Sequence, residues 1–124
     1  EKFVILELYM TPIDLLKLML PDFLVDHFEV VSANNTEETL HLYFEEKVKP
    51  PKEFNAFELV SKGFQDEITI QDFPIRGKFV YLHIKRRRWT NKVTGEILKR
   101  DWNLVAKGTR MTQEFAAFLK EINR

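Results

Sequence analysis

Four consecutive cations, residues 85–88, follow directly on the apolar alternation KFVYLHI, and Lys99 and Arg100 come just after a predicted turn. Guanidinium groups bind phosphate bidentately and ammonium groups bind it as point charges. Arg76 and Lys78 flank Gly77 at an earlier predicted turn. The residue types and spacing predict phosphate contacts, with candidates at Lys85, Arg86, Arg87, Arg88, Lys99, Arg100, Arg76 and Lys78.

The zero net charge of the 124-residue chain hides a separation of charge along it. Residues 1–75 hold six Lys/Arg against fifteen Asp/Glu, whereas residues 76–110 hold eleven against two. Charge clusters often lie on solvated faces without further meaning. This block is too one-sided for that interpretation, because such a run creates a local positive potential whatever the net charge. Nucleic-acid backbones are the commonest partner for such a patch.

The residues for other kinds of chemistry are scarce. His27, His41 and His83 lie in three different predicted elements, and the chain has no cysteine. Neither a metal-binding spacing nor a glycine-rich phosphate loop, nucleophile motif or catalytic carboxylate pair is recognisable. We expect no enzyme, no catalytic residue, no cofactor and no metal. His83 is either a packed strand residue or a phosphate contact, and its place in an apolar strand favours the first.

The cations must be positioned by the strand predicted over residues 78–89. Its side chains alternate between two faces. Both faces are apolar in the first part of the strand and cationic at its end, residues 85–88, which we call the predicted cationic tip. A turn then returns the chain through residues 96–105. Trp89 and Trp102 flank this turn, where they either stack on bases or brace the hairpin, and bracing is favoured in a small domain.

The remaining patterns predict an α+β fold: an antiparallel sheet with a long basic β-hairpin, a short N-terminal helical pair and a C-terminal amphipathic helix. We expect one domain over residues 1–124, with an acidic front half (10–48), an exposed proline-rich connector (48–55) and a basic back half (56–124). The expected elements are helices at 11–20, 21–28 and 113–124, the last capped by Thr112, and strands within 28–47, at 57–64 and at 67–74.

The stretch DFPIRGKFVYLHIKRRRW, from Asp72, resembles the signature D-[LF]-P-x-x-G-[RK]-x-V-x-[LV]-x-[LIV]-x-x-R-R-[FW] found in the N-terminal region of bacterial insertion-sequence transposases of the ISL-three family. The segment KGTRMTQEFAAFL, from Lys107, likewise resembles the family's lead into a helix. Together these cover roughly residues 66–120. The positions that match the signature are Asp72, Pro74, Gly77, Lys78, Val80, Leu82, Ile84, Arg87, Arg88 and Trp89.

One departure limits what the resemblance implies. The family's zinc-binding cysteines are replaced by residues such as Asn91 and Thr94, so the zinc site is not carried over. The chain is most similar to cysteine-free relatives of the ISAon-one type, whose N-terminal region can be encoded apart from the nuclease part. The resemblance implies binding to the terminal inverted repeats of the element, with a separate DDE nuclease domain, absent from these residues, cutting the DNA.

We therefore expect a cytoplasmic bacterial protein, without a membrane span, that binds DNA, with a DDE transposase subunit as a candidate second partner. Two alternatives stay open at this point. One is an RNA-binding module that uses the same cationic patch. The other is a protein-interaction domain in which the acidic front half of one copy meets the basic back half of another copy or of the nuclease subunit. The sequence leaves the oligomeric state and the bound DNA sequence undetermined.

Overall fold

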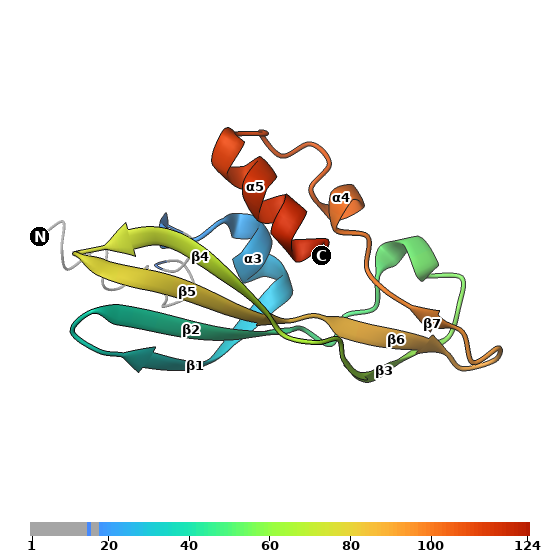
Figure 1. Cartoon of the computed structure of the whole chain (residues 1–124). Helices are drawn as coiled ribbons and strands as arrows, with labels where there is room; N and C mark the ends of the chain where they lie inside the picture. The colour runs from blue at the N-terminus through green and yellow to red at the C-terminus, as the bar shows by residue number, and fades with distance from the viewer. Residues whose placement is uncertain (1–14, 16–17) are drawn as a thin grey trace, which may run out of the picture.

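The computed structural model describes residue 15 and residues 18–124 (Figure 1). The predicted α+β class is confirmed. The helices are α3 (Asp22–His27), α4 (Trp102–Val105) and α5 (Gln113–Ile122), with a 3-10 helix, η1 (Lys52–Phe54). The strands are β1 (Phe28–Asn35), β2 (Thr39–Glu46), β3 (Leu59–Phe64), β4 (Ile68–Ile75), β5 (Lys78–Lys85), β6 (Arg87–Asn91) and β7 (Ile97–Leu98).

The strands form two sheets, of four strands in the order β1-β2-β5-β4 and of three strands in the order β3-β6-β7. The predicted antiparallel hairpin of β1 and β2 is confirmed. The first sheet is nevertheless mixed, because β2 and β5 pair in parallel, with Phe44 beside Ile84. The connector, β3 and β4 lie between these two strands in the sequence. Parallel pairing requires such a long connection.

The predicted long strand over residues 78–89 is interrupted. It is paired as β5 up to Lys85 and as β6 from Arg87, and Figure 1 shows β6 continuing the direction of β5 beyond the helices. At the break, the carbonyl of Arg86 accepts a hydrogen bond from Gln65 N at 2.8 Å. The two sheets are therefore consecutive parts of one twisted ribbon, since β3 leads into β4 as β5 leads into β6.

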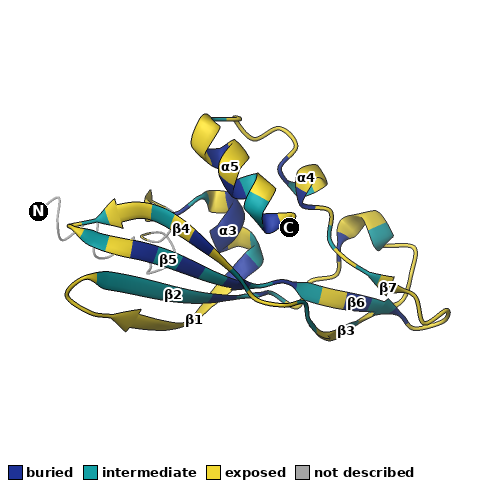
Figure 2. Cartoon of the chain, viewed as in Figure 1, coloured by how far each residue is buried: buried dark blue, intermediate teal, exposed yellow. Residues whose placement is uncertain are grey.

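Helices α3 and α5 lie on the same face of the four-stranded sheet (Figure 1). The core between them takes Phe44, Val80, Leu82 and Ile84 from the strands. Burial follows period two along β5, as expected for a strand with one face against a core (Figure 2). The cluster also includes aromatic residues on both sides of the connector, namely Phe23, Phe28, Trp102, Phe115 and Phe118.

The ends of the helices follow from local capping. The predicted cap of α5 is confirmed, because Thr112 Oγ1 accepts a hydrogen bond from Phe115 N at 3.1 Å. The predicted return strand over 96–105 is mostly wrong, since pairing ends at Leu98 and Asp101 caps α4 by accepting from the N–H groups of Asn103 and Leu104. Trp102 thus belongs to a helix, where it stacks on Phe28 with ring centroids 5.2 Å apart.

Of the predicted N-terminal helical pair, the second helix is confirmed as α3. Most of the first, at residues 11–20, lies outside the described residues. In the predicted connector, Val48, Lys49 and Pro50 are exposed and Pro51 is buried. Within the described part of the chain, no helix combines the length and apolar character needed to cross a bilayer.

Candidate nucleic-acid interface

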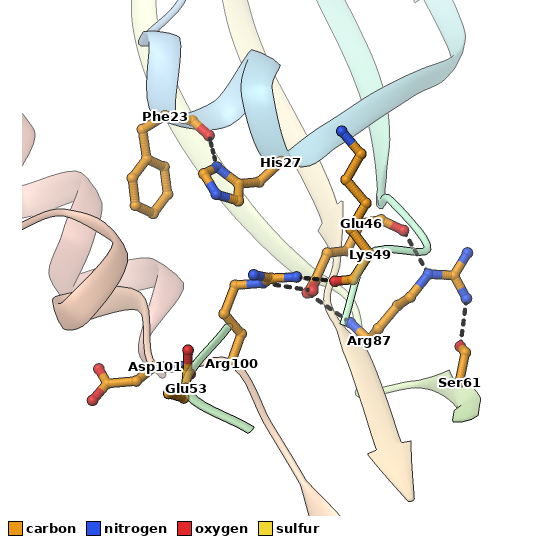
Figure 3. Close-up of polar contacts among 9 residues, drawn as sticks. All are labelled: Phe23, His27, Glu46, Lys49, Glu53, Ser61, Arg87, Arg100 and Asp101. Carbon is orange, nitrogen blue, oxygen red and sulfur yellow. Dashed lines mark hydrogen bonds and ion pairs between the residues drawn. The ribbon is translucent and has the colours of Figure 1, made fainter. Parts of the chain in front are cut away.

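A buried carboxylate organises the arginines of the predicted cationic tip (Figure 3). Glu46, 1% exposed, ends β2 on the same face as Phe44. Its Oε1 accepts a hydrogen bond from Arg87 N at 3.0 Å, and its Oε2 pairs with Arg100 Nε at 3.0 Å. A buried carboxylate is tolerated only with such partners. Glu46 therefore fixes β2 to the start of β6 and to the segment before α4.

The side chain of half-buried Arg87 makes three further contacts within the protein. Its Nε donates to the carbonyl of Glu46 at 2.6 Å and its Nη1 donates to Ser61 Oγ at 2.8 Å. Its guanidinium also lies over the Phe64 ring, 4.5 Å from the centroid. A cation over an aromatic face is an attractive arrangement. Arg87 thus joins the two sheets where the ribbon passes from one to the other.

Arg86 points into the protein from the break between β5 and β6. It is 5% exposed, and its Nη1 donates to the carbonyls of Ile122 at 2.8 Å and Arg124 at 2.7 Å. These carbonyls lie at and beyond the end of α5, where helical acceptors lack intrahelical partners. Burial lowers the pKa of the Arg86 guanidinium, and the charge of Glu46 acts in the opposite direction.

The prediction of an exposed cationic tip is therefore wrong for Arg86, Arg87 and Arg100. Their guanidinium groups lie at the junction of the two sheets, where they donate hydrogen bonds to Glu46 and to the carbonyls of Ile122 and Arg124. Trp89, 1% exposed, and Trp102, 3% exposed, are likewise buried. Base stacking by either tryptophan is excluded in this fold, because neither ring is available to a ligand.

Other cations remain exposed on the second sheet. In β6, Trp89 and Asn91 are buried, so period two turns Arg88 to the opposite face. Lys62 follows Ser61, the partner of Trp89, and Lys99 follows Leu98, also a partner of Trp89. Lys62, at the register shift that follows Ser61, and Lys99, directly after the end of β7, are both exposed beside the strand that carries Arg88. We call the exposed residues Lys62, Arg88, Lys92 and Lys99 the cationic face.

Figure 2 shows the turn after β6 as exposed, whereas the strands of the second sheet alternate between exposed, intermediate and buried residues. The guanidinium of Arg88 lies beside Gly63, within 3.9 Å of where a side chain at that position would begin. Two apolar side chains, Val60 at 44% exposed and Ile97 at 56%, belong to the same surface. The run of cations and the predicted turn indicated contacts at Arg88 and Lys99 but not at Lys62 and Lys92. Two sequence features could have indicated them: the period-two alternation in β3 for Lys62, and the turn after β6 for Lys92.

The other three predicted contacts lie elsewhere. Lys85 is half-buried in the first sheet, opposite Glu45 in the register of β2 and β5. Lys78 Nζ donates to Asn35 Oδ1, and Arg76 is exposed in the turn before β5. That turn is at the opposite end of the ribbon from Arg88, roughly 30 Å or more away at about 3.3 Å per residue. The structure does not bring Arg76 and Lys78 together with the cationic face.

A cluster of rings on the helix-free face of the first sheet was also missed. Tyr43 stacks on His83 with centroids 4.4 Å apart, and Tyr81 stacks on His41 at 5.0 Å. His41 Nδ1 is 2.7 Å from His83 Nε2, and His83 Nδ1 is 3.1 Å from Thr69 Oγ1. The cluster forms because β2 pairs in parallel with β5. It was not predicted, because His41 and His83 are 42 residues apart in the sequence. Among the described residues, no group of three potential metal ligands occurs.

No family model, curated protein or solved structure matches this chain.

Proposed function

We propose that this chain binds DNA as the non-catalytic N-terminal region of an insertion-sequence transposase. The observation that carries the proposal is the cationic face, because its four cations are exposed in the second sheet or directly beside its strands. Lysine and arginine contacts to phosphates position a protein on a duplex without reading its sequence. Each neutralised phosphate releases condensed counterion, which supplies favourable free energy.

The similarity of residues 72–89 to the transposase signature supports the same function. In this proposal the target is the terminal inverted repeat of the element, and a DDE nuclease domain or subunit performs the strand chemistry. The protein would act in the bacterial cytoplasm. Arg87 and Arg88, which match the signature side by side, have different roles, because Arg87 holds the two sheets together and Arg88 faces the DNA.

Fluorescence anisotropy with a labelled DNA duplex from the ends of the element tests this proposal. If the cationic face engages about four phosphates, the logarithm of affinity should fall against the logarithm of salt with a slope of about −3.6. A protection assay on the same DNA then locates the bound site. Failure to bind the duplex even at about 50 mM salt would contradict the proposal.

A second candidate, an RNA-binding module, is favoured by the rings on the open sheet face. Sheet surfaces with aromatic residues are used to bind unpaired bases. His41, Tyr43, Tyr81 and His83 stack on one another, however, so they occupy part of the ring surface that bases would need. A titration of an RNA hairpin in parallel with the duplex decides between the candidates, since clear preference for the hairpin would favour RNA.

A further inference from the structure

A pocket of about 640 Å³ lies where the connector meets the end of α3 and the segment from Arg100 into α4. Three lysines line it together with Arg100 and His27, namely Lys49 and Lys52 of the connector and Lys47 directly before it. Figure 3 shows the His27 ring and the Lys49 side chain on the same side of the Arg100 guanidinium. Cations from two separate segments, residues 47–52 and Arg100, therefore gather around one hollow.

Arg100 is a fixed donor in this pocket. Its side chain is 8% exposed, its Nε pairs with Glu46, and its Nη2 donates to the carbonyl of Lys49. The guanidinium also lies 5.7 Å from the centroid of the Trp102 ring. Among the described residues, its Nη1 has no hydrogen-bond partner, so it keeps donor capacity for a ligand. A donor held at several points loses little freedom when it binds.

The backbone of the connector is also anchored. Lys47 N donates to the carbonyl of His27 at 2.9 Å, and the carbonyl of Lys49 is held by Arg100. Pro50 and Pro51 restrict the chain that follows. In the described structure, the ammonium groups of Lys47, Lys49 and Lys52 make no hydrogen bond or ion pair. An anchored segment thus presents three available cations to the pocket.

Two carboxylates in the lining, Asp26 and Glu53, oppose this positive charge. Glu53 Oε1 accepts a hydrogen bond from Asp101 N at 3.1 Å, which directs that oxygen toward α4. Buried Glu46 offsets the charge of Arg100. Three ammonium groups then remain against two carboxylates, and the pocket keeps a positive excess together with directed N–H donors.

We infer that this pocket binds a phosphate group. Phosphate oxygens only accept hydrogen bonds, and the pocket offers a fixed guanidinium and mobile ammonium groups as donors. The volume is within the range of ligand sites and exceeds that of an isolated phosphate, so it leaves room for attached ester groups. We therefore expect the site to bind a phosphate group that is part of a larger molecule.

The identity of that molecule rests on the proposed function. Lys99 of the cationic face directly precedes Arg100 of the pocket, so the pocket and the cationic face are adjacent in the chain. The pocket would then bind a DNA phosphate beside those held by the second sheet. A free nucleotide or other small phosphate ester is the alternative source of the same group.

The test uses the Lys49→Gln, Lys52→Gln double variant, in which two exposed ammonium groups of the pocket are removed. Lys107→Gln, Lys120→Gln is the matched control, with the same charge change at exposed positions outside the pocket lining. Each protein is titrated with inorganic pyrophosphate and with duplex DNA. Amide chemical shifts report binding at the pocket, and anisotropy reports the salt dependence of DNA affinity.

We expect pyrophosphate to shift the amides of residues 47–53 and 100–105 in the wild type and in the control, with at least tenfold weaker binding in the pocket variant. With DNA, the pocket variant should flatten the salt slope by about 0.9 for one phosphate. Pyrophosphate binding at the pocket without any DNA binding would support the phosphate site and contradict the proposed function. Unchanged DNA affinity in the pocket variant, with no pyrophosphate shifts at the pocket, would overturn the inference even if the wild type binds DNA.

Discussion

The Glu46→Gln substitution tests how the arginine run is held. It removes the charge of a buried carboxylate and replaces one of its two acceptor oxygens by an amide N–H group. Arg87 N and Arg100 Nε each donate to a different oxygen at 3.0 Å, so one of these bonds must be lost. The Arg100 side chain, 8% exposed, would also keep its charge without a counterion.

Breaking a buried ion pair by removing one partner costs about 3–5 kcal/mol. The glutamine side chain retains one acceptor oxygen, so we expect a loss of about 3 kcal/mol in the free energy of unfolding. This is a large part of the 5–15 kcal/mol that is typical of the total stability of a domain. With a urea dependence of about 2 kcal/mol per molar, the midpoint should fall by about 1.5 M.

Urea denaturation followed by tryptophan fluorescence measures this loss. Glu45→Gln is the matched control, because it makes the same chemical change one residue away on the opposite, half-buried face of β2. The control should lose less than about 1 kcal/mol, as for a surface charge pair. A loss below about 1 kcal/mol in Glu46→Gln, or an equal loss in the two variants, would refute the role assigned to Glu46.

Three further predictions concern the rest of the fold. Arg86→Met should accelerate amide hydrogen exchange at the end of α5, because the carbonyls of Ile122 and Arg124 lose their donor; unchanged exchange there would contradict the contact. Excess EDTA should leave the melting temperature unchanged, since we expect a metal-free fold, and a fall reversed by zinc would show that this is wrong. Limited trypsin digestion should cut first after Lys52 in the connector or after Lys47 directly before it, and complete resistance of this segment would mean that its backbone is inaccessible.

Much of the fold follows from local patterns in the sequence. Period-two alternation placed Leu82 and Ile84 on one face of a strand, and Thr112 marked the start of the last helix. These signals involve residues within a few positions of one another, so a pattern suffices to detect them. The parallel pairing of β2 with β5 was not predicted, because alternation shows which face of a strand is buried but not which strand lies beside it.

The same alternation could have predicted that one of the arginines is buried. Arg86 continues the buried series of Leu82 and Ile84, and Glu46 continues that of Phe44. A charge on the core face requires a compensating partner. Sequence spacing could not supply it, because Glu46 is 54 residues from Arg100 and its contact depends on how the two sheets meet. Within β5 and β6, Arg86 and Arg87 are held by contacts inside the protein, whereas Arg88, which lies on the opposite face of β6 from buried Trp89, is exposed.

The salt dependence of DNA binding in the Arg88→Gln, Lys99→Gln variant tests the central proposal most directly. Both side chains are exposed on the cationic face, so the variant should keep its fold, which an unchanged urea midpoint would verify. Loss of two phosphate contacts should flatten the salt slope by about 1.8 relative to the wild type. The Lys107→Gln, Lys120→Gln control should keep the wild-type slope. A folded Arg88→Gln, Lys99→Gln variant with wild-type affinity and slope would contradict the assignment of DNA binding to this face.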